Sequence, residues 1–169
     1  MVTGAPHREN LADRREFRPV ALVVSLLCVG IVAGVGGAAS ADAASTYSQL
    51  AQPSWAPPSW LFGPVWTVLY ILMAIAAWRI WRTEPTFGNR AIMLYGAQLL
   101  LNLLWSPLFF GLEQRGWALV DIIALDALVV ATIVAFWFRD RLATILLTPY
   151  LAWSLFATAL NYSVWSLNS

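Results

Sequence analysis

The sequence has very few of the side chains that bind metals or form disulfides. It contains a single cysteine, Cys28, and a single histidine, His7. One cysteine cannot close an intramolecular disulfide, and a structural zinc site needs several cysteine or histidine ligands. We therefore expect no metal centre, no disulfide framework and no bound cofactor. Cys28 is interpreted as a small apolar side chain within an apolar run.

Charge is also scarce. Charged residues make up 11% of the chain and hydrophobic residues 60%, whereas a soluble domain is about one-quarter charged and about half apolar. The sequence has no Ser/His/Asp arrangement, no glycine-rich phosphate loop and no CxxC motif. It also lacks a basic stripe with interleaved aromatic residues. This composition points to a protein embedded in a lipid bilayer. It indicates neither a nucleic-acid partner nor a familiar catalytic site.

Apolar segments dominate the chain. A helix needs ~20 mostly apolar residues to cross a hydrocarbon core of ~30 Å, and a helix satisfies its backbone groups internally. The strict alternation typical of a transmembrane barrel is absent. The sequence therefore predicts an all-α integral membrane protein, a bundle of five transmembrane helices spanning residues 19–169 after a solvated or disordered polar tail (1–18). The predicted helices are 19–39, 62–81, 90–110, 117–138 and 142–165.

The connection between the first two predicted helices, residues 40–61, is the only long one. It contains Pro53, Pro57 and Pro58, interleaved with tryptophans that include Trp55. Prolines at this density exclude a continuing helix and stiffen the chain. Long loops in compact proteins are usually functional or disordered, and tryptophans favour the first alternative here.

Arginine is distributed unevenly between the two sides of the predicted bundle, and lysine is absent. Nine arginines fall in the N-terminal tail and in the regions after the second and fourth helices, and only Arg115 falls on the opposite side. Short cytoplasmic segments carry the excess of positive charge in membrane proteins. We therefore expect a multi-pass protein of a bacterial cell membrane, with its N-terminus in the cytoplasm and residues 40–61 outside.

Aromatic and amide side chains lie deep in the predicted helices. Trp66, Trp105 and Trp153 are far from helix ends, where an indole N–H needs a hydrogen-bond partner. Gln98 and Asn102 are four residues apart and share one helix face with Trp105. The pattern favours a bundle interior with aromatic walls. Two roles stay open for Asn102: contact with a ligand, or an amide that only ties helices together.

Two carboxylates, Asp121 and Asp126, fall inside a predicted span. Their spacing of five places them about 140° apart around a helix, so they do not form a paired acid–base site. An ionised side chain at the bilayer centre costs at least ~2.5 kcal/mol. We therefore expect Asp126 to face the interior and to be hydrogen-bonded to a neighbouring helix, and we predict no catalytic residue here.

Four motifs occur in order along the chain. They are QPSWAPPSW with FGPVWTVLY (52–60 and 62–70), GAQL with WSP (96–99 and 105–107), GWALVD (116–121), and PYLAW with ALNYSVW (149–153 and 159–165). Together they resemble the translocator protein family, also known as TspO/MBR, the tryptophan-rich sensory proteins or the peripheral-type benzodiazepine receptor. The resemblance runs from about residue 19 to residue 168.

The resemblance implies a five-helix bundle, often a homodimer, with a hydrophobic-ligand pocket under a lid formed by residues 40–61. Family ligands include porphyrins such as protoporphyrin IX, steroids such as cholesterol, and synthetic benzodiazepines and isoquinolines. The family's proposed cholesterol motif ends in a basic residue, but Ser166 stands at that position here, and this favours a porphyrin. The ligand-binding residues implied are Trp55, Trp66, Tyr70, Asn102, Trp105, Trp153 and Ala157.

Three functions follow from these observations. The first is binding or transport of a flat, hydrophobic tetrapyrrole, with membrane lipid as the surrounding partner. The second is a stress-linked sensory regulator of tetrapyrrole metabolism, in which residues 1–18 recruit a cytoplasmic partner. The third is light-dependent porphyrin degradation, in which the bound pigment supplies the chemistry and Trp66 or Trp153 is oxidised or transfers electrons.

Overall fold

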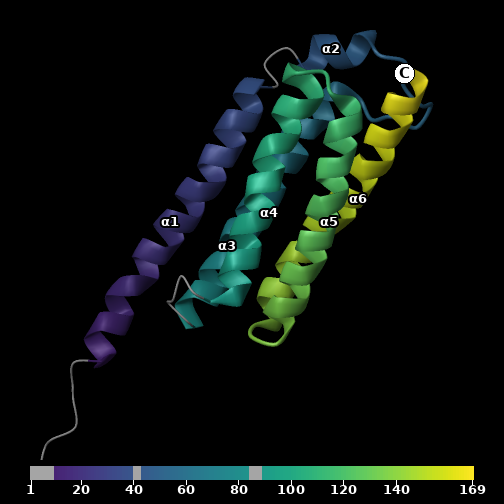
Figure 1. Cartoon of the computed structure of the whole chain (residues 1–169). Coiled ribbons are helices and arrows are strands. Elements are labelled where there is room, and N and C mark those ends of the chain that lie inside the picture. Colours follow the sequence, from purple (N-terminus) through teal and green to yellow (C-terminus); the bar gives the residue numbers. More distant parts are fainter. Residues whose placement is uncertain (1–9, 40–42, 84–88) are drawn as a thin grey trace, which may run out of the picture.

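The computed structural model describes residues 10–39, 43–83 and 89–169, and the regular structure in these residues is entirely helical (Figure 1). The long helices are α1 (Asn10–Ala39), α3 (Phe62–Thr83), α4 (Arg90–Ser106), α5 (Arg115–Trp137) and α6 (Arg141–Leu167). The short elements are α2 (Ala43–Gln49), the 3-10 helix η1 (Ser59–Leu61) and the π-helical turn η2 (Pro107–Gly111). The predicted all-α class is confirmed.

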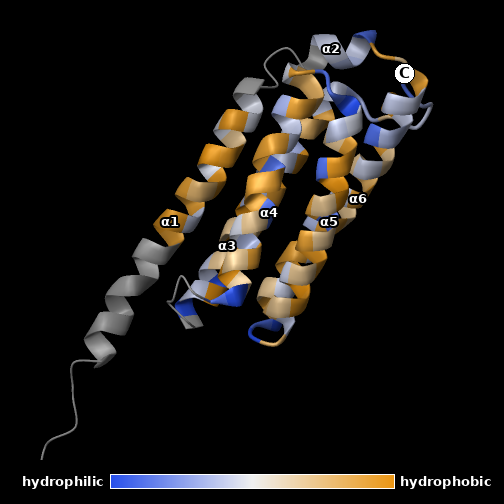
Figure 2. Ribbon diagram, in the orientation of Figure 1, coloured by the Kyte–Doolittle hydropathy of each residue, from blue (hydrophilic) through white to orange (hydrophobic). Residues whose placement is uncertain are grey.

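Helix length and hydropathy identify the membrane spans. Among the described residues, four helices are long and apolar enough to cross a membrane: Ser59–Arg82, Arg90–Gly111, Arg115–Trp137 and Arg141–Leu167. Within α1, the residues whose side chains are described include the apolar stretch Leu22–Gly37. Hydrophobic residues dominate the middle of the bundle, and hydrophilic ones gather toward the turns at its ends (Figure 2). The chain is a multi-pass membrane protein with the predicted five-helix bundle.

The long helices close into a ring. Helix α1 packs against α3 and α4, helix α6 packs against α3 and α5, and α5 also packs against α4. Small side chains permit the close approach of membrane helices. Ala74, Ala76 and Ala77 of α3 are all buried and serve this purpose. The ring leaves an interior toward which one face of each helix points.

The segment between α1 and α3 crosses the end of the bundle that also carries the C-terminus (Figure 1). Tyr47 of α2 is buried, and its ring meets Phe62 edge-on with the centroids 5.5 Å apart. The Ala51 N–H donates to Asn168 Oδ1, and Asn168 Nδ2 donates to the Ala51 carbonyl, both at 3.0 Å. The segment is therefore fastened to the start of α3 and to the end of α6.

The structure refines two predicted segments. Helix α1 begins at Asn10, so residues 10–18 of the predicted solvated or disordered tail are helical and not disordered. Their solvation stays a prediction, and residues 1–9 lie outside the described residues. Leu, Ala, Arg and Glu in that stretch are good helix formers, so the helix continues beyond its apolar part. The connection 40–61 contains helical turns as well as proline-rich chain. Other helix ends move by a few residues, as termini commonly do.

Helix α4 ends at Ser106, and the chain continues from Pro107 as the π-helical turn η2. The proline lacks an N–H group, and the Leu112 N–H reaches back five residues to the Pro107 carbonyl at 2.8 Å. This wider turn, η2, carries Phe109 and Phe110. Single π-helical turns inside α-helices are often found at functional sites.

Candidate ligand pocket

A cavity of about 440 Å³ lies inside the ring, beneath α2 and η1. Its volume falls within the ~300–1,000 Å³ range of small-molecule sites. The described lining comes from every helical element except α5, and it contains no charged side chain. The lining residues are Ala33, Gly36, Gly37, Tyr47, Ser59, Phe62, Gly63, Trp66, Thr67, Tyr70, Trp105, Ser106, Phe109, Phe110, Ala157, Leu160 and Asn161.

Stacked aromatic pairs from two elements of the ring form much of the wall. On α3, the rings of Trp66 and Tyr70 stack with centroids 5.2 Å apart. On α4 and η2, the rings of Trp105 and Phe109 stack at 5.1 Å, and Phe110 meets Trp105 edge-on at 6.0 Å. The π-helical turn brings both phenylalanines to the cavity. Such walls offer flat apolar surfaces to a ligand.

Four predicted ligand-binding residues line this cavity: Trp66, Tyr70, Trp105 and Ala157. Asn102 instead lies behind the wall. Its Oδ1 accepts a hydrogen bond from Tyr70 Oη at 2.9 Å, and its Nδ2 donates to Tyr150 Oη at 3.0 Å. Of the two roles left open for Asn102, the structure supports the amide that ties helices together, here α3, α4 and α6.

Trp153 and Trp55 also lie outside the lining. The Trp153 ring contacts Phe62 at 5.9 Å and Phe156 at 5.2 Å, and Trp55 meets Phe156 at 5.7 Å. The Trp153 indole N–H is buried and has no partner among the described residues. These two tryptophans support the cavity from the α6 side, beside a lining residue, Phe62.

Asn161 is the amide that reaches the cavity itself. Its Oδ1 accepts a hydrogen bond from Trp105 Nε1 at 3.0 Å, and its Nδ2 donates to the Arg115 carbonyl at 2.9 Å. Asn161 thus fixes the orientation of one aromatic wall and joins α4, α5 and α6. It was not among the predicted site residues, although a buried amide within a transmembrane helix is the kind of signal that could have identified it.

The contribution of α1 could not be read from the sequence. Gly36 and Gly37 line the cavity, and a Cβ added at Gly36 would lie 3.6 Å from Ser106 Oγ. Gly34 is exposed and does not line the cavity. Glycines on one helix therefore differ in role, because only some of them face the interior.

Asp126 lies in the core and not in the cavity wall. Its Oδ2 accepts a hydrogen bond from Thr158 Oγ1 at 2.7 Å, which confirms the predicted bond to a neighbouring helix. Neither Asp126 nor Asp121 lines the cavity. In the described part of the chain, no group of three or more His, Cys, Asp or Glu residues could hold a metal ion.

The fold and the cavity together define a class of protein. Transmembrane helices surround an uncharged cavity with aromatic walls, and an ordered segment fastened to α6 crosses the end above it. This is a polytopic membrane protein with an uncharged pocket of small-molecule size within the bundle.

Comparison with known proteins identifies the family. The TspO/MBR family profile matches residues 21–166. The chain is 46% identical to the human translocator protein over 125 residues, which is 72% of this chain and 74% of that protein. It is 43% identical to the tryptophan-rich protein TspO of Archaeoglobus fulgidus over 149 residues, with coverage of 88% and 97%. The tryptophan-rich sensory protein of Cereibacter sphaeroides is 41% identical over 122 residues, with coverage of 72% and 76%. The chain belongs to the TspO/MBR family.

Proposed function

We propose that this protein is a membrane receptor or transporter that binds a flat, hydrophobic tetrapyrrole such as protoporphyrin IX in the aromatic cavity. The observation that carries the proposal is the pair of stacked walls, Trp66 on Tyr70 and Trp105 on Phe109. Two extended aromatic surfaces match the faces of a planar macrocycle better than those of a globular ligand.

The neutral lining supports an apolar ligand body. Because the described lining has no charged side chain, carboxylates carried by a porphyrin must lie toward the mouth of the cavity. Ser59 of η1 lines the cavity and belongs to the segment between α1 and α3 that crosses the end of the bundle. A hydroxyl there can donate a hydrogen bond to a carboxylate. The Arg115 guanidinium lines a different hollow.

The test compares two glycine-to-leucine variants on one helix. Gly36→Leu places a large side chain in the cavity near Ser106, whereas Gly34→Leu faces open space. Binding is measured as quenching of tryptophan fluorescence by protoporphyrin IX in detergent. We expect saturable quenching in the parent and in Gly34→Leu, and at least about ten-fold weaker binding in Gly36→Leu, because the added side chain occupies the ligand's volume.

Two outcomes separate binding from partitioning. Non-saturating quenching of equal strength in all three proteins means that the pigment enters the micelles, and the porphyrin assignment then fails. Circular dichroism and thermal unfolding of both variants control for a folding defect. If Gly36→Leu unfolds, Trp66→Leu removes one stacked wall without adding volume and makes the same prediction.

A second candidate function is light-dependent degradation of the bound pigment, and one observation favours it: the Trp66 ring lies in the cavity wall. Trp153 is outside the lining, so Trp66 is the better candidate for the residue that is oxidised. Illumination of the protein loaded with pigment should yield a new pigment product. The amount of this product should fall in Trp66→Phe and stay unchanged in Trp153→Phe. Unchanged pigment in the illuminated parent contradicts this function.

We also propose that the protein lies in a bacterial cell membrane with its N-terminus in the cytoplasm. Arg79 and Asp140 form an ion pair at one end of the bundle, near Arg139 and Arg141. The opposite end carries Arg115 and the segment between α1 and α3. This distribution follows the positive-inside pattern. A reporter fused to the C-terminus should be active only outside the cytoplasm, and cytoplasmic activity would contradict the orientation.

A further inference from the structure

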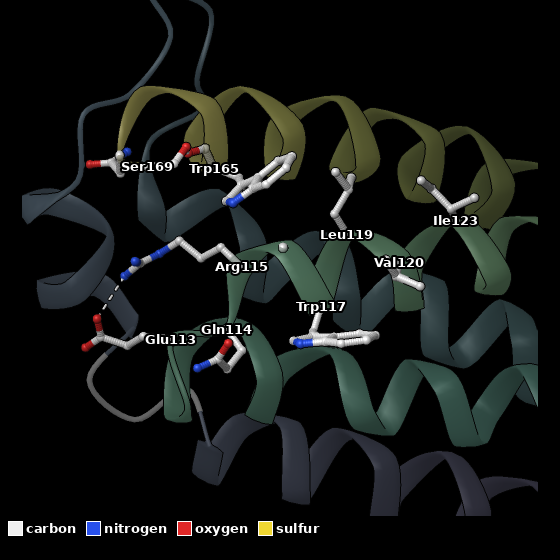
Figure 3. A pocket seen from close by; sticks show the side chains of 11 residues that line it. Glu113, Gln114, Arg115, Trp117, Leu119, Val120, Ile123, Trp165 and Ser169 are labelled. Atoms are coloured by element: carbon white, nitrogen blue, oxygen red, sulfur yellow. Dashed lines mark hydrogen bonds and ion pairs between the residues drawn. The ribbon is translucent and has the colours of Figure 1, made fainter.

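A second hollow, of about 620 Å³, lies between the start of α5 and the end of α6 (Figure 3). It belongs to the outer surface of the bundle, and it shares no lining residue with the aromatic cavity. Polar residues form one end, namely Glu113, Arg115, Asn168 and Ser169. Leu119, Val120 and Ile123 extend along the other end, and the rings of Trp117 and Trp165 lie between the two (Figure 3).

The hollow lies at the depth of a membrane interface. The candidate span of α5 begins at Arg115, and that of α6 ends at Leu167. Trp117 and Trp165 are 66% and 40% exposed, and exposed tryptophans at span ends are typical of the headgroup region. An occupant of this hollow therefore meets water at its polar end and hydrocarbon at its apolar end.

The polar end carries one cation beside one anion. Arg115 Nη2 lies 3.2 Å from Glu113 Oε2, and the Arg115 side chain is only 14% exposed, whereas that of Glu113 is 64% exposed. The Arg115 Nε is buried and has no hydrogen-bond partner among the described residues. A guanidinium presents donors in a planar fork that suits a phosphate. The bond from Nη2 to Glu113 is the one hydrogen bond that this guanidinium makes among the described residues, so the other Nη donors of Arg115 are the ones that can serve a phosphate in the hollow.

We propose that this hollow binds a phospholipid with a primary ammonium headgroup, of the phosphatidylethanolamine type. The lipid phosphate accepts hydrogen bonds from the Arg115 guanidinium, and the ammonium group donates to the Glu113 carboxylate. One acyl chain lies along Val120 and Ile123, which are 56% and 54% exposed.

The adjacent opposite charges select among headgroups. A purely anionic headgroup meets Arg115 but is repelled by the neighbouring Glu113 carboxylate. A quaternary ammonium group has no N–H to donate to that carboxylate. A headgroup that combines a phosphate with a primary ammonium matches both charges. The order of affinity expected is therefore phosphatidylethanolamine first, with phosphatidylcholine and phosphatidylglycerol below it.

The full chain in detergent is mixed with each of the three lipids, all carrying the same acyl chains. Native mass spectrometry then measures the lipid that stays bound when the protein is released from the detergent. Arg115→Gln removes the phosphate donor but keeps the backbone carbonyl that accepts from Asn161. Arg141→Gln, at the other end of the bundle, is the matched control. We expect Arg115→Gln to weaken phosphatidylethanolamine binding at least about ten-fold and Arg141→Gln to leave it unchanged.

Glu113→Gln tests the selectivity. Removing that carboxylate should abolish the preference for phosphatidylethanolamine over phosphatidylglycerol. Equal retention of all three lipids by the parent, or unchanged binding in Arg115→Gln, overturns the proposal. Loss of the bound lipid on addition of inorganic phosphate assigns the site to free phosphate. A dimer that carries no lipid and dissociates in Arg115→Gln assigns the hollow to a second copy of the chain.

Discussion

Asn102 joins three helices, and its removal offers the sharpest test of how the bundle is held together. The amide accepts from Tyr70 and donates to Tyr150. Tyr150 is fully buried. Hydrogen bonds between membrane helices average ~0.6 kcal/mol each, so the two bonds account for about 1.2 kcal/mol. A buried hydroxyl left without a partner adds about 1–3 kcal/mol.

We therefore expect Asn102→Ala to lower the free energy of unfolding by about 2–3 kcal/mol, at the lower part of the combined range, because Tyr70 is only partly buried and can find another partner. At about 2–4 °C per kcal/mol for a chain of this size, the melting temperature in detergent should fall by about 4–12 °C. Tyr70→Phe, which removes only one of the two bonds, should shift it much less.

A double-mutant cycle distinguishes the hydrogen bond from lost packing. If the Asn102–Tyr150 bond is the cause, Tyr150→Phe should cost far less in the Asn102→Ala background than in the parent, with a coupling energy of about 1 kcal/mol. Strictly additive effects of the two substitutions would refute the reasoning. An unchanged melting temperature in Asn102→Ala would refute it as well.

Two other contacts give further predictions. Thr158→Val leaves the buried Asp126 carboxyl without its hydroxyl partner, so it should lower the melting temperature more than Thr132→Val, whose hydroxyl bonds only its own helix. Burial raises the pKa of Asp140. Hydrogen bonds from the backbone and from Arg79, together with the Arg79 charge, lower that pKa by more than burial raises it, so it lies below its usual value. The ion pair therefore stabilises the fold above pH 3.8 and loses this effect as the pH falls through the lower folded pKa. Asp140→Asn should cost up to about 1 kcal/mol in unfolding measurements at neutral pH, and the difference from the parent should shrink in acid. An acid-independent difference would contradict the Asp140 prediction, and equal melting temperatures of the two threonine variants would contradict the first.

The architecture of the bundle was readable from the sequence because membrane thickness fixes helix length. Runs of about twenty apolar residues in lipid have few structural alternatives to a helix, and the predicted helices lie within a few residues of the observed ones. The exception is α1, whose polar first turns lie beyond the apolar run. Hydropathy reports the solvent around a helix, and it does not report where a helix ends in water.

The residues that line the cavity could be predicted only in part, because the direction of a side chain depends on its partners from other helices. Trp66 and Trp105 could be placed inside from their depth alone. Asn102 has the same depth and polarity as a ligand contact, but Tyr70 and Tyr150 already occupy its oxygen and its nitrogen. Similarly, Gly36 and Gly34 are the same residue type, and only the packing of α1 in the bundle shows that Gly36 lines the cavity and Gly34 does not.

Two of the buried amides, Asn102 and Asn161, indicate what kind of selectivity the cavity can have. Asn102 and Asn161 each use both polar atoms in bonds between helices. These strong hydrogen-bonding groups therefore hold the aromatic walls in place, and their polar atoms already have partners within the protein. Discrimination by a site that pairs specific ligand groups can reach several orders of magnitude, whereas apolar contact alone discriminates weakly. Under the proposed function, we therefore expect this cavity to select ligands mainly by their flatness and size, with hydroxyls such as that of Ser59 as the remaining hydrogen-bonding groups of the lining.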